Sequence, residues 1–268
     1  MTLDNALWYG GVLAEAAVLA LLLYRRVWRT FPVFFVYVFW VLLIDAGNFE
    51  VLRLVGGPST HGYLIAYVAE RVGDSTLEIC VLIELAWSVL LPIRPSLPKI
   101  SLAVVALLVL ATGAAIWPFS GIHGQAGLPP AWSVLVHVQQ TSSILRILFF
   151  FVLTACSQFL SIGWRDRELQ IASGLGFYSL VSVAVDILEQ HQAMTPRFGV
   201  LSQVVAASYF CSWLYWVFSF AQKEAERREF TPQMQNLLLA VAGTARSSRI
   251  GLTDRTSRGD RDDRNRRE

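Results

Sequence analysis

The sequence is poor in the residues from which most metal, redox and cofactor sites are built. It has three cysteines and four histidines among 268 residues. The cysteines form no CxxC pair, and the histidine spacings match no metal-binding motif. We therefore expect no metal site, no disulfide framework and no bound cofactor. All three cysteines lie inside apolar segments, which predicts that they are buried packing residues.

Motifs of the common enzyme and receptor classes are also missing. The chain contains no GxGxxG fingerprint, no Walker loop and no HExxH pair. A retinal Schiff base needs a lysine in the last apolar segment, but the only lysines, Lys99 and Lys223, stand at the borders of apolar segments. The sequence therefore does not favour an enzyme or a retinal protein. It gives no reason to expect a nucleic-acid partner.

Long hydrophobic runs dominate what is present. Hydrophobic residues make up 54% of the chain and charged residues 16%, and the mean hydropathy is +0.49. This composition is typical of a polytopic membrane protein in contact with the lipid bilayer. Seven apolar segments are close to or longer than the ~20 residues needed to span hydrocarbon. They cover residues 6–24, 31–54, 62–91, 99–117, 131–163, 168–190 and 198–222.

These segments predict an all-α fold, a seven-helix transmembrane domain over residues 1–222 of a multi-pass protein of the cell membrane. Basic residues predict its orientation, because cytoplasmic loops carry an excess of Lys and Arg. Ten of them follow the odd-numbered segments, and only Arg53 and Arg197 follow the even-numbered ones. The N-terminus is thus predicted outside and the C-terminus inside. Residues 223–268 are predicted to form a charged, largely disordered cytoplasmic tail, a possible contact for a cytoplasmic protein partner.

The segment 62–91 is unusual because it carries five charged residues within a span-length run. On a helix they fall within one face about 140° wide. A charge that faces lipid costs roughly 2.5–3.5 kcal/mol on insertion scales. We therefore expect this face to be turned towards neighbouring helices or a wet cavity. The residues are Glu70, Arg71, Asp74, Glu78 and Glu84.

Other segments place ionisable groups at similar depth in the outer half of the membrane. We predict that they line an outward-opening acidic cavity together with the segment 62–91. A small polar or cationic ligand would contact Glu70, Asp74 and Glu78, and Asp45, His137 and Asp186 would flank it. The alternative reading is a set of structural ion pairs and interhelical hydrogen bonds.

Arg146 is the most informative single residue, because it lies about 22 Å from the outer end of its segment. Asp74 and Glu78 are its candidate partners, and Arg71 is a second candidate for a structural ion pair. His137 is nine residues from Arg146, which puts the two on opposite faces of one helix. Either this helix is buried on both sides or only one of the two residues faces the cavity.

The sequence thus favours a sensor or receptor-like membrane protein that binds a small polar or cationic ligand. A proton- or cation-coupled transporter could use the same acids. In a non-catalytic structural subunit they would only hold the helices of the bundle together. The interior distinguishes these functions. A dry, fully paired interior favours the structural role, a cavity open only outward favours a receptor, and a passage into the inner half favours transport.

Overall fold

The computed structural model describes residues 3–54, 61–90, 100–120, 130–156, 166–191 and 198–222. Within these ranges the chain is helical and contains no strand, which confirms the predicted all-α class. The element order is α1 (Leu3–Tyr24), a short 3-10 turn η1 (Val27–Arg29), α2 (Pro32–Leu54), α3 (His61–Val89), α4 (Ser101–Ser120), α5 (Pro130–Cys156), α6 (Arg167–His191) and α7 (Phe198–Ala221).

Five of these helices, α1 and α4 to α7, are long and apolar enough to cross a membrane. This indicates a multi-pass membrane protein. The remaining two helices fall short for different reasons, because the apolar stretch of α2 that is described is too short and α3 is too highly charged. The apolar part of α2 covers only Pro32–Gly47, and α3 carries the five charges noted above. Both pack against other helices of the bundle, so their polar groups have neighbours other than lipid.

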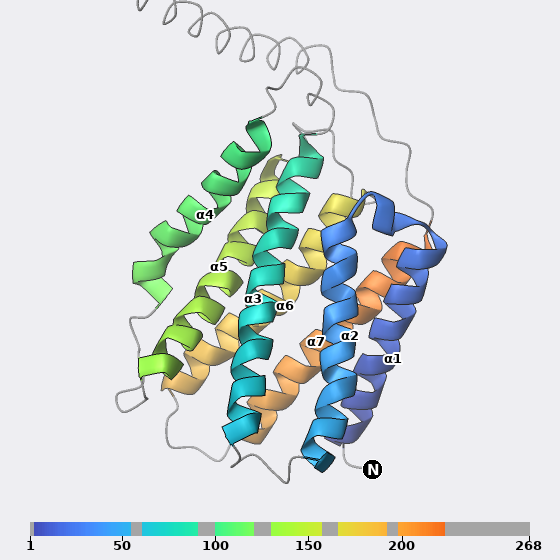
Figure 1. Ribbon diagram of the computed structural model, residues 1–268, viewed down its shortest axis with the longest axis vertical. Helices are drawn as coiled ribbons and strands as arrows, with labels where there is room; N and C mark the ends of the chain where they lie inside the picture. The colour runs from blue at the N-terminus through green and yellow to red at the C-terminus, as the bar shows by residue number, and fades with distance from the viewer. Residues whose placement is uncertain are drawn as a thin grey trace, which may run out of the picture.

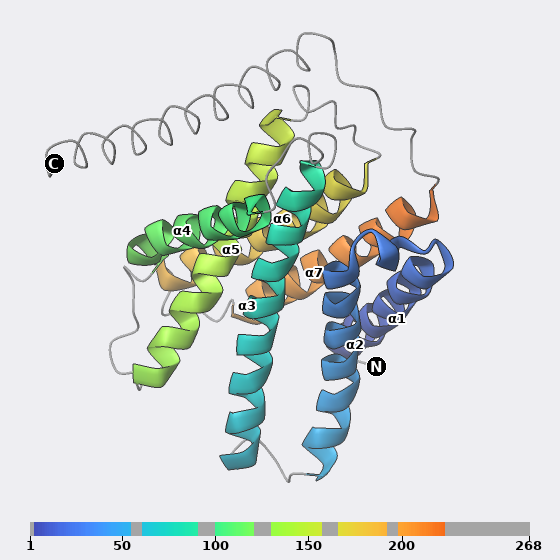
Figure 2. The ribbon, with the colours of Figure 1, turned by 45° about the horizontal axis from the view of Figure 1, so that its top comes forward.

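Six of the helices form a closed ring, and the seventh lies outside it. Around the ring α1 packs on α2, α2 on α3, α3 on α5, α5 on α6, α6 on α7, and α7 on α1. Among the described helices, α4 packs mainly against α3 and α5 from the outside, and it is tilted away from α3 in both views (Figures 1 and 2). The ring order means that residues far apart in the sequence face one another across one interior.

Some helix boundaries differ from the prediction. Helix α4 continues to Ser120 instead of ending at residue 117, with Pro118 in its last turn. A proline there removes only one intrahelical hydrogen bond near the helix end, which the helix tolerates. The predicted continuation of α5 to residue 163 and the tail 223–268 lie outside the described residues.

The prediction that the cysteines are buried is wrong for Cys211, and the side chain of Cys156 lies outside the described residues. Cys80 is half-buried, but Cys211 is exposed on α7. Because α7 is apolar enough to cross a membrane, its outward positions accept a small, weakly polar side chain without a protein neighbour.

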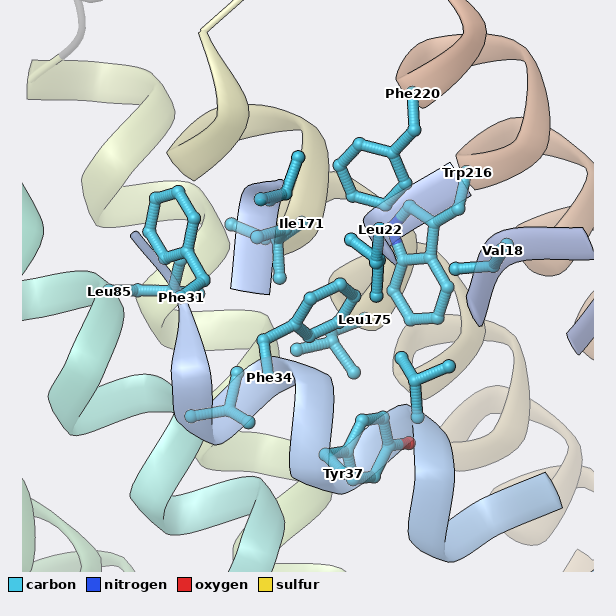
Figure 3. Packing of buried hydrophobic residues seen from close by; sticks show 14 of the residues in the cluster. Val18, Leu22, Phe31, Phe34, Tyr37, Leu85, Ile171, Leu175, Trp216 and Phe220 are labelled. Atoms are coloured by element: carbon cyan, nitrogen blue, oxygen red, sulfur yellow. The ribbon is translucent and has the colours of Figure 1, made fainter. Parts of the chain in front are cut away.

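One half of the ring interior is filled by large apolar side chains. Phe34 of α2 contacts Trp216 and Phe220 of α7. Phe31 from the preceding turn and Leu22 of α1 belong to the same buried cluster (Figure 3). The rings of Phe34 and Trp216 pack edge to face with centroids 5.3 Å apart, a favoured aromatic geometry. We call this cluster the apolar core. It occupies the end of the ring where α1 ends and α2 begins.

Charged side chains close the helix ends beside the apolar core. Glu84 of α3 accepts hydrogen bonds at 2.8 Å from the backbone N–H groups of Val33 and Phe34, in the first turn of α2. Arg25 and Arg167 donate to the last carbonyl groups of α7, at 2.7 Å to Ala221 and 2.8 Å to Ser219. These contacts place an anion at a helix N-terminus and cations at a C-terminus, as the helix dipole favours.

Candidate functional site

The other half of the ring interior contains a polar cavity of about 230 Å³. Helices α2, α3, α5, α6 and α7 all contribute to its wall. The described lining residues include four carboxylates, two arginines and three tyrosines. They are Asp45, Glu70, Asp74 and Glu78; Arg71 and Arg146; and Tyr37, Tyr178 and Tyr209.

Helix α3 supplies the largest share of this wall, and its periodicity explains why. Glu70, Asp74 and Glu78 follow one another at intervals of four residues, so they lie on one face with a rise of about 6 Å between neighbours. On the other side of the helix, Val68 and Val72 are exposed. The prediction that the charged face of this segment turns towards its neighbours is confirmed.

A buried ion pair forms the deepest part of the cavity. Arg146 of α5 donates from Nη1 to Glu78 Oε1 at 2.5 Å, and Ser142 donates from Oγ to Glu78 Oε2 at 2.7 Å. Arg146 Nη2 also donates to Ser143 Oγ at 2.9 Å. Arg146 is 4% exposed and Glu78 9%. The predicted pairing of Arg146 with an α3 carboxylate is thus confirmed, and its partner is Glu78.

Asp74, one turn nearer the start of α3, is held by a tryptophan of α2. Trp40 Nε1 donates to Asp74 Oδ1 at 2.9 Å. Glycine at position 73 makes this approach possible, because a Cβ atom there would lie 2.7 Å from Trp40 Cζ2. One carboxylate oxygen of Asp74 is therefore oriented by the protein, in a side chain that also lines the cavity.

A further carboxylate lies behind the cavity wall. Glu15 of α1 is fully buried and accepts a hydrogen bond from Tyr209 Oη at 2.7 Å. Tyr209 itself lines the cavity, as does Asp45 of α2. The ring order brings α1 between α2 and α7, which places Glu15 on this side of the ring. Tyr209 therefore links the buried Glu15 to the cavity wall.

The structure brings together four of the six predicted ligand-binding residues: Glu70, Asp74, Glu78 and Asp45. His137 and Asp186 are not among the described residues that line the cavity. The ring of His137 lies beside that of Trp117 on α4, with centroids 5.6 Å apart. For His137 the reason is the opposite-face geometry, because Arg146 takes the inward face of α5.

Arg71 has a different environment from the predicted ion pair. Its guanidinium lies over the ring of Tyr67, 5.2 Å from the centroid, and it lines the cavity beside Glu70 and Asp74. A cation over an aromatic face is attracted by the negative potential of the ring. Arg71 is therefore placed at the cavity as a cation held by an aromatic ring of its own helix.

The sequence reasoning missed the tyrosines of the cavity wall. Tyr37, Val41, Ile44 and Asp45 are spaced i, i+4, i+7 and i+8, which is the signature of one helix face. The same holds for Tyr178 and Ser182 on α6. The helix faces that carry Asp45 and Ser182 also carry Tyr37 and Tyr178, so helical periodicity could have predicted these tyrosines. A pattern limited to charged residues and histidines does not include them.

No protein-family model matches this chain, and no curated protein or solved structure is significantly similar to it. Fold and site therefore define the molecule by class only, as a helical membrane protein with a polar cavity inside its ring. Fold does not by itself imply a function. What the protein does has to be argued from the charges and shape of this cavity.

Proposed function

We propose that this protein is a sensor or receptor-like membrane protein whose cavity binds a small organic cation. The observation that carries the proposal is the charge imbalance of the cavity wall. Its four carboxylates against two arginines leave a formal charge of −2, since 2 − 4 = −2. Arg146 is already paired with Glu78, so Arg71 is the other arginine in a wall that also carries Asp45 and Asp74. A cation brings the missing positive charge.

The arrangement of the acids favours an organic cation over a bare metal ion. In the described part of the chain, no group of three or more His, Cys, Asp or Glu residues is placed to hold a metal ion. The α3 acids are instead spaced about 6 Å apart along the helix. Tyr37, Tyr178 and Tyr209 offer aromatic surface between them, which suits an ammonium or guanidinium group.

The position of the cavity favours a receptor over a transporter. Its residues lie in the half of the ring where α2 ends and α3 begins, which the distribution of basic residues predicts to be the outer half. The apolar core fills the other half with Phe34, Trp216 and Phe220, each at most 2% exposed. Transport would need a passage through that core. We propose that the N-terminus is outside and that the cavity accepts its ligand from there.

The test is a ligand-induced thermal shift of the purified full-length protein in detergent. The probes are alkylamines, alkyl diamines, tetramethylammonium and guanidinium, with acetate as an anionic comparison. We expect at least one cation to raise the unfolding temperature, because a ligand that binds only the folded state stabilises it. Asp74→Asn should weaken that cation by about tenfold or more, since hydrogen bonds to charged groups contribute roughly 1.5–3 kcal/mol.

Glu84→Gln is the matched control, because it removes another α3 carboxylate that lies outside the cavity lining. The control should lower stability slightly and leave the ligand-induced shift intact. A cation that stabilises wild type and Asp74→Asn equally, or a panel without any stabilising cation, would count against the cavity as a cation site. Uptake of the cation into sealed vesicles would favour the transporter instead.

A further inference from the structure

A second cavity lies outside the ring, between α4 and the outer side of α3 and α5. Its volume is about 400 Å³. We call it the α4 groove. Helices α3, α4 and α5 each supply apolar side chains to its walls, among them Leu82 and Ala86, Val105 and Val109, and Leu145 and Phe149.

The α4 groove is open towards the surroundings of the bundle. Four of its lining side chains are more than two-fifths exposed, namely Val104 (53%), Leu108 (65%), Leu148 (42%) and Val152 (53%). Both α4 and α5 are apolar and long enough to cross a membrane. The groove therefore opens onto the surface that faces lipid when these helices span the bilayer.

Water is a poor occupant of such a groove. The one polar side chain among its described lining residues is Thr112, whose hydroxyl already donates to the carbonyl oxygen of Leu108 at 2.8 Å. A buried water needs two to four polar partners, and apolar cavities without them stay dry. An empty groove, however, leaves its walls without the dispersion contacts of close packing. A hydrocarbon chain needs no polar partner, and it restores the dispersion contacts of the groove walls.

Helix α4 also lacks the protein contacts that hold the other helices. In the described part of the chain it packs mainly against α3 and α5, and Val109 and Ser120 are its only buried residues. In a membrane there is little hydrophobic driving force between helices, so association depends on packing. A chain wedged beside Val109 supplies packing that neighbouring helices do not.

We propose that the α4 groove binds an acyl chain of a bilayer phospholipid, packed between α4 and the α3–α5 side of the ring. This site is separate from the polar cavity and does not depend on the function proposed for it. The two are nevertheless neighbours, because Leu145 lines the groove while the next residue, Arg146, lines the cavity. The bound chain thus packs against the helix that carries the buried ion pair.

The first test measures retained phospholipid by native mass spectrometry of the full-length protein in a mild detergent. Ala86→Phe and Val105→Phe each place a ring into the groove. Leu107→Phe is the matched control, because Leu107 is 67% exposed on α4 and does not line the groove. We expect a phospholipid adduct on wild type and on the control, and a loss of about tenfold in the two filled variants.

The second test works on the unmutated protein and stays informative if a filled variant fails to fold. The protein is reconstituted into phosphatidylcholine vesicles that contain a small fraction of a phospholipid with a photoreactive diazirine in one acyl chain. Crosslinks should concentrate on groove residues such as Ala86, Val105 and Phe149. Equal labelling of outward positions such as Phe218, which is 68% exposed on α7, would overturn the proposal. Equal adduct retention in filled and control variants would also overturn it.

Discussion

The two halves of the ring interior share most of their helices but are held together in different ways. Around the apolar core, Phe31, Phe34 and Trp216 fill the space by packing. Around the polar cavity, Glu78 and Asp74 are fixed by an ion pair and single hydrogen bonds, and about 230 Å³ is left unfilled by side chains. Tyr37 belongs to both halves, since its ring packs in the core and it also lines the cavity.

The difference assigns separate tasks to the two halves. Close packing tolerates no gap and leaves no room for a ligand, so the apolar core sets the arrangement of the helices. A cavity with directional contacts gives up packing and keeps polar groups oriented, as binding sites do. Substitutions in the core should therefore change stability alone. Substitutions in the cavity should change ligand binding as well, and the size of that change should not follow the change in stability.

The largest effect is expected from Arg146→Ala. It leaves Glu78 buried without its counter-charge, and removal of one member of a buried pair costs about 3–5 kcal/mol. We expect the variant to accumulate poorly in the membrane and to unfold at a much lower temperature in detergent. Normal expression together with an unchanged unfolding temperature would contradict the pairing as a structural element.

A double variant separates the charge from the volume. Arg146→Met combined with Glu78→Leu removes both charges and keeps apolar bulk at each position. Replacement of a whole buried pair by apolar residues is often neutral or stabilising. The double variant should therefore recover most of the stability that Arg146→Ala loses. A double variant as unstable as the single one would mean that the surrounding serines, rather than the charges, are critical.

Leu22→Ala tests the apolar core and should cost about 3 kcal/mol, because truncation leaves a void among fixed neighbours. Leu22 is fully buried, whereas the adjacent Leu23 is 51% exposed. Leu23→Ala is therefore a matched control, with an expected cost well below 1 kcal/mol. Thermal unfolding in detergent measures both. Similar losses in the two variants would mean that the core does not determine the stability of this half.

Much of this division could be read from the sequence, because helical periodicity fixes which residues share a face. The five charges of the segment 62–91 and the depth of Arg146 sufficed to place a polar interior beside α3 and to pair Arg146 with an acid. Periodicity also put His137 and Arg146 on opposite faces of one helix, which left open whether both faces are buried or only one of the two residues faces the cavity. The structure resolves that choice in favour of Arg146.

The ring order could not be obtained in the same way. Periodicity gives the inward face of each helix but not its neighbours, so the exclusion of α4 from the ring and the contact of Glu15 with Tyr209 remained invisible. The α4 groove was hidden for the same reason. An apolar residue such as Leu82 or Val105 looks alike in a sequence whether it faces another helix or a lipid chain.

Glu84→Ala should have a moderate effect at the end of the ring next to the core. Glu84 accepts hydrogen bonds from two N–H groups in the first turn of α2, and loss of such a cap costs roughly 0.5–2 kcal/mol. Because the cap is charged and bridges two helices, we expect about 2 kcal/mol. Glu84→Gln keeps one acceptor oxygen and should lose less. Equal losses would assign the effect to charge rather than to capping.

The smallest effect on stability is expected from Trp40→Phe, which deletes the indole N–H that binds Asp74 at 2.9 Å. One hydrogen bond contributes about 1 kcal/mol. Trp216→Phe makes the same change in the apolar core, where Trp216 Nε1 donates to the carbonyl oxygen of Gln170 at 3.1 Å. Both variants should have a lower unfolding temperature than wild type. The unfolding temperature of Trp216→Phe should be the lower of the two, because Trp216 is only 2% exposed.

The loss of cation binding should be larger in Trp40→Phe than in Trp216→Phe, which is the reverse of the order expected for the loss of stability. Trp40→Phe releases Asp74 from its fixed orientation and should reduce the shift caused by a bound cation, since a loosely held carboxylate loses part of its preorganisation. Trp216 is not among the described residues that line the cavity. The cation-induced shift of Trp216→Phe should therefore match that of wild type. If the thermal shift instead follows stability in both variants, the two halves act as one unit and the separation of their tasks is wrong.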